Sequence, residues 1–450
     1  MAGLTIPPSP PSSTTGASRL EARAKEIVEK IFGIAVDGVE RAPILDYNAN
    51  TISYEVYFLQ TMWSLRDAPK QHGVVRMPSG SRQLVIQFKI PQGNMDQGRW
   101  AENKVAAMYT ARTILYNTLY LHTVPEVYAW SDGSDDEYNN AWIIHSSHPP
   151  GDAPLKQSFY EMSAEHQSEI LGQIATIHKL FQSYDHMVVC QGYGGFRFSE
   201  EGYVRSGEAL MTGVGGPFPN LGSYLTEMLR RDLRRAEERQ DIEGWRKSPE
   251  LRSRLEEFVE QSVKDIVAEI PEYRPTFTLN RIELGNFLVS QRPDQSPIIS
   301  YILNWNYASL GHPLEEFIYS YNSLHGALLF PMDSDSLVMS RCILEGFPDG
   351  DVEIDLRDLD NYAYYDDGMS AQSQYNLARN LYEALQIAEV DRPQDIEGAK
   401  KLVVFLGFCA AVGGRGLYRD DPASNADPDE VYQDKAKQVE EYMKLLGYWP

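Results

Sequence analysis

The sequence has few cysteines and no long apolar segment. Its three cysteines, Cys190, Cys342 and Cys409, stand far apart in a chain of 450 residues, and none belongs to a CxxC pair. This spacing argues against a zinc site or a disulfide framework and fits a reducing compartment. No run of about 20 apolar residues is present that could span a bilayer. We therefore expect a cytoplasmic protein whose cysteines are core residues.

Basic residues are scarce as well. The 41 Lys and Arg residues are outnumbered by 64 Asp and Glu residues, which gives a net charge of −23. Such a surface repels phosphate backbones and anionic lipid headgroups, so we expect neither a nucleic-acid partner nor a membrane partner. Residues 1–18, MAGLTIPPSPPSSTTGAS, lack the basic region and apolar core of a signal peptide. Their Pro, Ser and Thr content predicts a disordered tail.

The remaining sequence predicts an α+β protein with a strand-rich first part. The length exceeds the roughly 250 to 300 residues at which one core stops growing, so more than one lobe is expected. Residues 19–148 form the predicted N-lobe, with apolar residues at helical spacing or in strand-like alternation. Its expected elements are a helix from Arg19 to about Gly33, strands at Ile52–Phe58 and Leu84–Ile90, a helix at Glu102–Leu121, and strands at Val124–Trp130 and Ala141–Ser146.

The pattern changes after the His148–Gly151 segment. Residues 149–450 predict a helical C-lobe interrupted by two hairpins, one at Phe196–Tyr203 and one within TFTLNRIELGNFLV, Thr276–Val289. In the second hairpin, Arg281 and Glu283 stand at the tip between two short strands. A strand-loop-strand of this kind usually presents polar side chains at its tip, which makes Arg281 and Glu283 candidate functional residues.

The order of several short motifs limits the number of folds that the sequence could adopt. VIQFKIP, a helix bearing Glu102, VPEVYAW, WIIHSSHPPG, GGPF, FTLNRIELGNFLV and ISYILNWNYASLGHPLEE follow one another along almost the whole chain after the tail. Together they resemble the aminoglycoside phosphotransferase-like family of small-molecule kinases, especially its fungal branch. No single motif is specific, but their order and spacing are. The resemblance implies a bilobal protein-kinase-like fold with a strand-rich N-lobe and a helical C-lobe.

The catalytic motifs depart from the family pattern. In that family the catalytic loop reads roughly F-T-H-G-D-L-H-P-x-N, and the resemblance places Arg281 at its catalytic Asp and Glu283 at its second His, while Asn286 is retained. The later family strand reads I-I-D-W-E, and here Asn304 stands at the metal-binding Asp and Asn306 where an acidic residue is common. The catalytic hairpin is therefore degenerate at the positions that matter most for phosphotransfer.

These replacements remove the charges that phosphoryl transfer needs. A carboxylate must orient and deprotonate the attacking hydroxyl, and carboxylates must hold Mg²⁺ against the nucleotide phosphates. Arginine cannot act as a base at neutral pH because its pKa lies above about 12. We therefore expect no metal site and no cofactor. ATP and Mg²⁺ enter only if Glu283 supports an atypical phosphotransferase.

The nucleotide side of the resemblance is altered too. The loop LDYNANT, Leu45–Thr51, contains no glycine, so backbone N–H groups lose the residue that usually lets them approach phosphates. Lys89 in VIQFKIP is the candidate for the strand cation that contacts phosphates, with Glu102 as its partner on the helix. The alternative is an exposed lysine and a solvated glutamate, which contribute little.

Three functions remain open at the level of sequence. In the first, the expected cleft binds or processes a small anionic metabolite, with Arg281, Glu283 and Asn304 as candidate catalytic residues. Lys89, Glu102, Asn286 and Asn306 are then the candidate ligand-binding residues. In the second, the protein is a pseudokinase that binds a protein partner. In the third, it is the atypical phosphotransferase. The fungal character of the motif pattern suggests a place in secondary metabolism for the first.

Overall fold

The computed structural model describes most of the chain. The described residues are 14–42, 51–57, 71–89, 97–134, 140–149, 151–184, 192–210, 212–326, 328, 338–348, 371–414 and 428–448. The glycine-free loop before Thr51 lies outside them, as does Cys190. The two other cysteines, Cys342 and Cys409, are buried and free. Among the described residues, no helix has the length and apolar character needed to cross a membrane.

One antiparallel sheet forms the core of the N-lobe. Its five strands lie in the order β1-β2-β3-β5-β4, and each pair of neighbours is antiparallel. Strand β3 pairs with β5, the second strand of the β4-β5 hairpin. The strands are β1 (Gly38–Arg41), β2 (Thr51–Tyr57), β3 (Gln83–Lys89), β4 (Val127–Ser131) and β5 (Trp142–Ser146). The strands expected from sequence alternation are confirmed, with ends that differ by a few residues.

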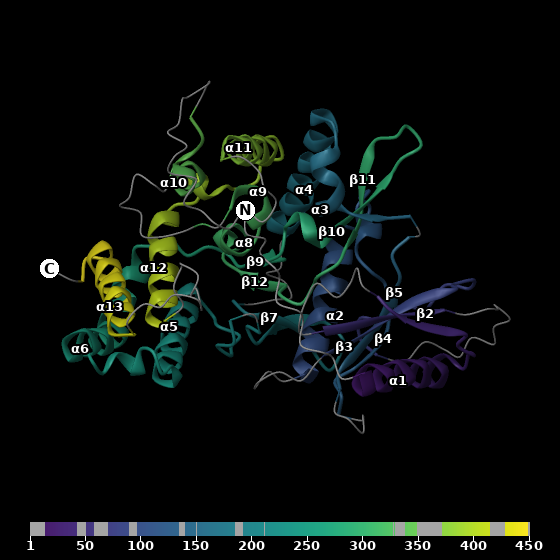
Figure 1. The fold of residues 1–450 in the computed structure, drawn as a ribbon, viewed down its shortest axis with the longest axis horizontal. Coiled ribbons are helices and arrows are strands. Elements are labelled where there is room, and N and C mark those ends of the chain that lie inside the picture. The colour runs from purple at the N-terminus through teal and green to yellow at the C-terminus, as the bar shows by residue number, and fades with distance from the viewer. Residues whose placement is uncertain are drawn as a thin grey trace.

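The two faces of this sheet pack against different helices. Alternation along β3 places Leu84, Ile86 and Phe88 in an apolar cluster with residues of α1 (Thr14–Phe32). Gln87 therefore points to the opposite face of the sheet, on the side of α2 (Gln97–Ile114). In Figure 1, α2 lies between the sheet and the helices of the C-lobe. Helix α1 begins at Thr14, inside the segment expected to be a tail, and the domain boundaries otherwise stay a prediction.

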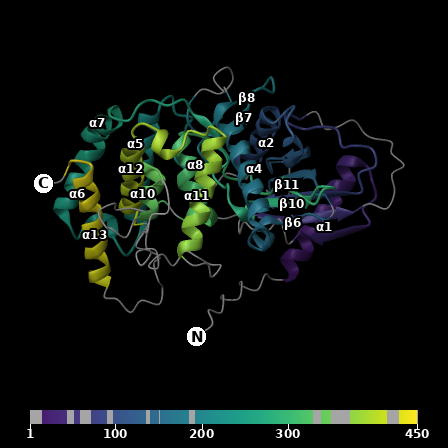
Figure 2. The ribbon, with the colours of Figure 1, turned by 90° about the horizontal axis from the view of Figure 1, so that it is seen from above.

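The C-lobe is mainly helical. Figure 1 and Figure 2 show α5, α6, α12 and α13 gathered at the end of the molecule farthest from α1. Its helices are α3 (Leu155–Ser158), α4 (Ala164–Ser183), α5 (Leu221–Glu238), α6 (Pro249–Glu257), α7 (Val263–Ala268), α8 (Pro313–Tyr319), α9 (Asn322–His325), α10 (Val338–Glu345), α11 (Ala371–Ile387), α12 (Ala399–Val412) and α13 (Pro428–Leu445). Short η turns lie at Leu121–Thr123, Phe159–Glu161, Glu243–Trp245, Phe258–Ser262, Leu284–Asn286 and Pro393–Asp395.

Short strands connect these helices. They are β6 (Ala153–Pro154), β7 (Gly195–Phe198), β8 (Val204–Gly207), β9 (Thr276–Thr278), β10 (Phe287–Gln291), β11 (Pro297–Ile302) and β12 (Ser309–Gly311). The predicted hairpin near Phe196 is confirmed, since β7 and β8 pair with each other. One apolar core joins α2 to α4, α5 and α12, so the two lobes share packed side chains.

The segment Thr276–Val289 is not the hairpin that its sequence suggests. Strand β9 pairs with β12, whereas β10 pairs with β11 and β6. The chain between them turns through Asn280, whose φ of 56° is left-handed, and then through the η turn Leu284–Asn286. Two strands that diverge in this way hold a wide loop between separate sheets, and the prediction of a hairpin is therefore wrong.

Candidate functional site

A buried carboxylate from α8 holds the loop that follows β9. Glu316 is 2% exposed, and its two carboxylate oxygens accept hydrogen bonds from the N–H groups of Leu279 at 2.6 Å and Asn280 at 2.9 Å. The Ser320 hydroxyl donates a third hydrogen bond. Burial raises the pKa of Glu316 to about 7, although these three donors oppose that shift. These hydrogen bonds hold the loop backbone in place independently of the side chains at the loop tip.

The buried side chain of Asn280 adds a second anchor. Its amide Nδ2 donates hydrogen bonds to the Tyr307 carbonyl at 2.9 Å and to the Ser309 hydroxyl at 2.8 Å. Asparagine tolerates the left-handed backbone found here better than most residues. In the family pattern quoted above, Asn280 stands where the loop has its glycine, and here it adopts a φ of 56°.

Arg281 and Glu283 pair with each other. The Arg281 Nη1 atom lies 3.1 Å from Glu283 Oε1, and the two side chains are 39% and 29% exposed. The guanidinium also lies over the Tyr307 ring, 4.9 Å from its centroid. These contacts support a structural role for Arg281 within the loop. Glu283, for its part, faces a cation that would compete with any metal ion for its carboxylate.

Asn286 links this loop to the strand-end segment that carries Asn304. Its Nδ2 donates hydrogen bonds to the carbonyl oxygens of Arg281 at 2.9 Å and Asn304 at 3.3 Å, and its Oδ1 accepts the Asn304 N–H at 2.5 Å. Asn286 is only 3% exposed. Its amide is fully engaged in holding the backbone, which favours a positioning role over direct contact with a ligand.

Asn304 and Asn306 are also engaged within the protein. Asn304 Oδ1 accepts the Asn306 N–H at 3.0 Å, and Asn306 Oδ1 accepts the indole N–H of Trp100 at 3.0 Å. The second bond joins α2 of the N-lobe to the C-lobe segment that resembles a metal-binding motif. The structure therefore brings Arg281, Glu283, Asn286, Asn304 and Asn306 together, as the sequence analysis expected.

Lys89 and Glu102 do not form the pair expected from sequence. Glu102 Oε1 accepts the Phe198 N–H at 2.9 Å, so this carboxylate faces β7 and not β3. Lys89 is 5% exposed, and no carboxylate lies within ion-pair distance of it among the described residues. Burial lowers the pKa of Lys89. The orientation of α2 about its axis directs Glu102 to the β7-β8 hairpin. Glu102 is therefore not the partner of Lys89.

The residue of α2 that faces Lys89 is another lysine, Lys104. It is 2% exposed, and its Nζ donates a hydrogen bond to Gln87 Oε1 on β3. Burial, followed by the positive charge of Lys89, lowers the pKa of Lys104 to about 7. His145 on β5 is also buried nearby, and burial together with the Lys104 charge lowers its pKa to about 3.

Trp100 lies against both lysines. The Nζ atoms of Lys89 and Lys104 are 5.9 Å and 5.6 Å from the centroid of its ring, within the range of cation–π attraction. Sequence reasoning missed Lys104 and Trp100, although a signal was present. Both residues belong to the apolar stripe of α2 with Met108 and Ala111, and a lysine in such a stripe must be buried.

Among the described residues, no group of three or more His, Cys, Asp or Glu side chains could hold a metal ion. The arrangement that is present consists of two buried lysine amines, one aromatic ring whose centroid lies 5.9 Å and 5.6 Å from them, and a neutral asparagine network on the facing lobe. This set of groups can attract an anion and donate hydrogen bonds to it. The described residues contribute no unpaired carboxylate to the arrangement.

Comparison with known families agrees with this architecture. Residues 55–335 match the phosphotransferase enzyme family. The chain belongs to this family. The match includes β3, β4 and β5 of the sheet, the loop at Arg281 and the segment at Asn304, so it covers both halves of the site. Comparison with curated proteins gives no match.

Comparison with solved structures matches this chain to several small-molecule kinases. The aminoglycoside phosphotransferase APH(2'')-Ib bound to ADP is 11% identical with a TM-score of 0.43, covering 94% of this chain and 99% of that chain. The gentamicin complex of APH(2")-IIa is 11% identical with a TM-score of 0.45, covering 93% and 95%. An ethanolamine kinase of Plasmodium vivax is 12% identical with a TM-score of 0.40, covering 97% and 95%. At these identities and TM-scores, nothing further about this chain is inferred from the likeness.

Proposed function

We propose that this member of the phosphotransferase enzyme family binds a small anionic molecule between its lobes and does not carry out ordinary Mg-ATP phosphotransfer. The observation that carries the proposal is the pair of buried lysines, Lys89 and Lys104, beside which the described part of the chain places no carboxylate. Two like charges in a poorly solvated site are unfavourable unless one is deprotonated or an anion joins them. A ligand phosphate or carboxylate supplies that anion.

The loss of phosphotransfer rests on a different group of residues. Arg281 stands where the family loop has its catalytic Asp, and Asn304 stands where it has a metal-binding Asp. The one acidic side chain at the loop tip, Glu283, is neutralised by Arg281 at 3.1 Å. A general base and a metal carboxylate are the parts that such transfer requires. Their replacement favours binding, or chemistry other than phosphorylation.

Proton uptake provides a sharp test of the anion site. At pH 7.5 Lys104 is partly deprotonated, because its pKa is lowered to about 7, and an anion beside it favours the charged form. Pyrophosphate binding to the full-length protein is measured by isothermal titration calorimetry in two buffers with different ionisation enthalpies. We expect binding without Mg²⁺ and with uptake of a fraction of a proton.

Three variants locate the site. Lys104→Met should abolish the proton uptake and Lys89→Met should weaken binding, since each removes one ammonium group. Lys264→Met, which changes an exposed lysine of α7, is the matched control and should bind as the wild type does. Binding that survives both Lys89→Met and Lys104→Met would refute the site.

Nucleotide titrations test the second half of the proposal. A ligand at 100 times its Kd stabilises the folded state by about 2.7 kcal/mol, so a productive nucleotide site is readily detected by thermal unfolding. We expect ATP to stabilise the protein no more with Mg²⁺ than without it. A rise in melting temperature that requires Mg²⁺, or measurable ATP hydrolysis, would show that phosphotransfer chemistry persists. Absence of binding by any anion tested would instead leave the protein-binding function.

A further inference from the structure

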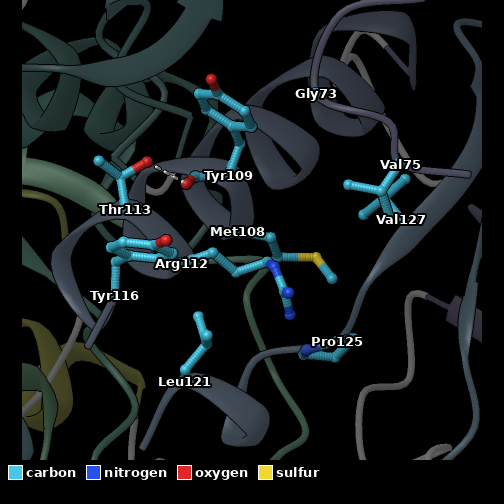
Figure 3. Close-up of a pocket in the computed structure, with 10 residues that line it drawn as sticks. All are labelled: Gly73, Val75, Met108, Tyr109, Arg112, Thr113, Tyr116, Leu121, Pro125 and Val127. Carbon is cyan, nitrogen blue, oxygen red and sulfur yellow. Dashed lines mark hydrogen bonds between the residues drawn. The ribbon is translucent and has the colours of Figure 1, made fainter. Parts of the chain in front are cut away.

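A pocket of about 350 Å³ lies on the N-lobe beside the second half of α2. It is bounded by α2, the beginning of β4 and residues 73–75, as Figure 3 shows. Its lining residues are Gly73, Val75, Met108, Tyr109, Arg112, Thr113, Tyr116, Leu121, Pro125 and Val127. None of them belongs to the site formed by the lysines and the asparagine network. The volume is within the roughly 300 to 1,000 Å³ typical of small-molecule pockets.

The walls of this pocket are mostly apolar, and its rim is aromatic. Met108 and Val127 are 1% and 3% exposed and form part of the packed core behind it. Tyr109 and Tyr116 are 46% and 67% exposed, which is unusual for such large rings. An apolar floor with exposed aromatic rings at its edge provides flat surfaces against which a ring-shaped ligand can pack.

Arg112 is the polar group within this apolar surround. Its Nη1 donates a hydrogen bond to the Val124 carbonyl at 2.8 Å, and its Nη2 donates one to Glu126 Oε1 at 2.9 Å. A guanidinium has five N–H groups, so three of those of Arg112 have no partner among the described residues. The side chain is 23% exposed. Figure 3 shows the guanidinium on the same side of the pocket as Met108 and Pro125.

We propose that this pocket binds a small, uncharged molecule with a flat apolar body and one oxygen that accepts a hydrogen bond. The apolar body matches the walls and the aromatic rim, and the oxygen receives an N–H of Arg112. An uncharged acceptor is favoured over a carboxylate because Glu126, at 2.9 Å, already balances the Arg112 charge. The net charge of −23 further disfavours an anion at a surface site.

Three probes of similar shape test the chemistry of the site. Indole-3-acetamide carries a neutral carbonyl, indole-3-acetate carries an anion, and indole carries no acceptor oxygen. Their binding to the full-length protein is measured by isothermal titration calorimetry. We expect indole-3-acetamide to bind most tightly, with indole and indole-3-acetate each weaker by about tenfold, which corresponds to about 1.4 kcal/mol.

Substitutions place the binding in the pocket. Leu121→Ala and Tyr116→Ala remove parts of the lining and should each weaken indole-3-acetamide by several-fold, while Val75→Trp should fill the space and abolish binding. Leu119→Ala is the matched control, because Leu119 is 71% exposed and does not line the pocket. Tyr116 is exposed enough that its removal leaves the fold intact, so the test does not depend on Val75→Trp folding.

Several results would overturn the proposal. If none of the three probes binds, the pocket is not a ligand site of this kind. If indole-3-acetate binds more tightly than indole-3-acetamide, the site recognises anions, and the assignment of an uncharged ligand is wrong. If Tyr116→Ala and Leu121→Ala bind as the wild type does, the probe lies elsewhere. These outcomes are separable from failure of the anion site, since Lys89→Met should leave indole-3-acetamide binding unchanged.

Discussion

The two charged groups at the junction of the lobes differ in how their charges are balanced. On the helical lobe, Arg281 and Glu283 form an ion pair at 3.1 Å, and both remain partly in solvent. On the sheet lobe, Lys89 and Lys104 carry the same charge and are nearly buried. The charges of Arg281 and Glu283 neutralise each other. The described residues supply no such counter-charge to Lys89 and Lys104, so deprotonation or a bound anion would stabilise that pair. The two groups therefore differ in whether an added anion would stabilise them.

The largest effect on stability is expected from the carboxylate that holds the backbone of the loop around Arg281. Glu316→Ala removes the acceptor for two buried backbone N–H groups and the Ser320 hydroxyl. Each unsatisfied buried donor costs about 1–3 kcal/mol, so for three donors we expect a loss of at least about 3 kcal/mol in the free energy of unfolding. Urea denaturation measures it. Glu316→Gln, which keeps one acceptor oxygen, should lose less, and a loss below about 1 kcal/mol in Glu316→Ala would contradict the anchoring role.

The lysine pair should make stability depend on pH. The pKa of Lys104 is about 7 in the folded state, against 10.5 for a lysine side chain in water. Between these values the unfolded state binds more protons, so stability rises as pH increases. From pH 7 to 9 the rise from one group is at most about 2.7 kcal/mol, at about 1.36 kcal/mol per pH unit.

Lys104→Met tests this dependence through urea unfolding at pH 7 and pH 9. The variant should lose the rise that the wild type has, while the exposed control Lys264→Met should keep it. Lys89 and His145 face Lys104 from β3 and β5 and remain in all three proteins. The Lys104 charge also lowers the pKa of His145, but His145 titrates below pH 7, so the comparison between pH 7 and pH 9 reports mainly on Lys104. An equal rise in Lys104→Met and the wild type would mean that Lys104 is solvated and carries its charge at pH 9.

The Arg281–Glu283 pair should give the smallest effect. Partly exposed ion pairs contribute about 0–1 kcal/mol, so Arg281→Ala and Arg281→Lys should each change the free energy of unfolding by less than about 1 kcal/mol. Pyrophosphate affinity should also be unchanged, because the pair is internal to the loop. If Arg281→Lys retained its stability but lost ligand binding, Arg281 would be a bidentate anchor for the ligand, and the contrast between the two lobes would fail.

Some parts of this architecture follow directly from local sequence patterns. Alternation in LVIQFKI defined β3 and put Gln87 and Lys89 on one face, and helical spacing from Ile170 to Phe181 defined α4. The short motifs also predicted that Arg281, Asn286 and Asn304 would lie together. These features depend on neighbouring residues or on a motif order shared by the whole family, so the sequence is sufficient to find them.

Other parts depended on contacts between distant segments. The sequence suggested that the strands on either side of Arg281 pair with each other, yet β9 pairs with β12 instead. The partner of a strand is chosen by the packing of the whole lobe, and here the anchor is Glu316, far along the chain in α8. No local pattern around Arg281 contains that information.

The sequence by itself predicted a strand-rich lobe followed by a helical lobe, and it placed Lys89 within a strand of the first lobe. Only the tertiary structure decided which residue of α2 meets Lys89. The rotation of a helix about its axis is set by the fit of its apolar stripe against the sheet and the other lobe. In α2 that fit buries Trp100 and Lys104 and directs Glu102 to the Phe198 N–H, so the expected opposite charges became two like charges.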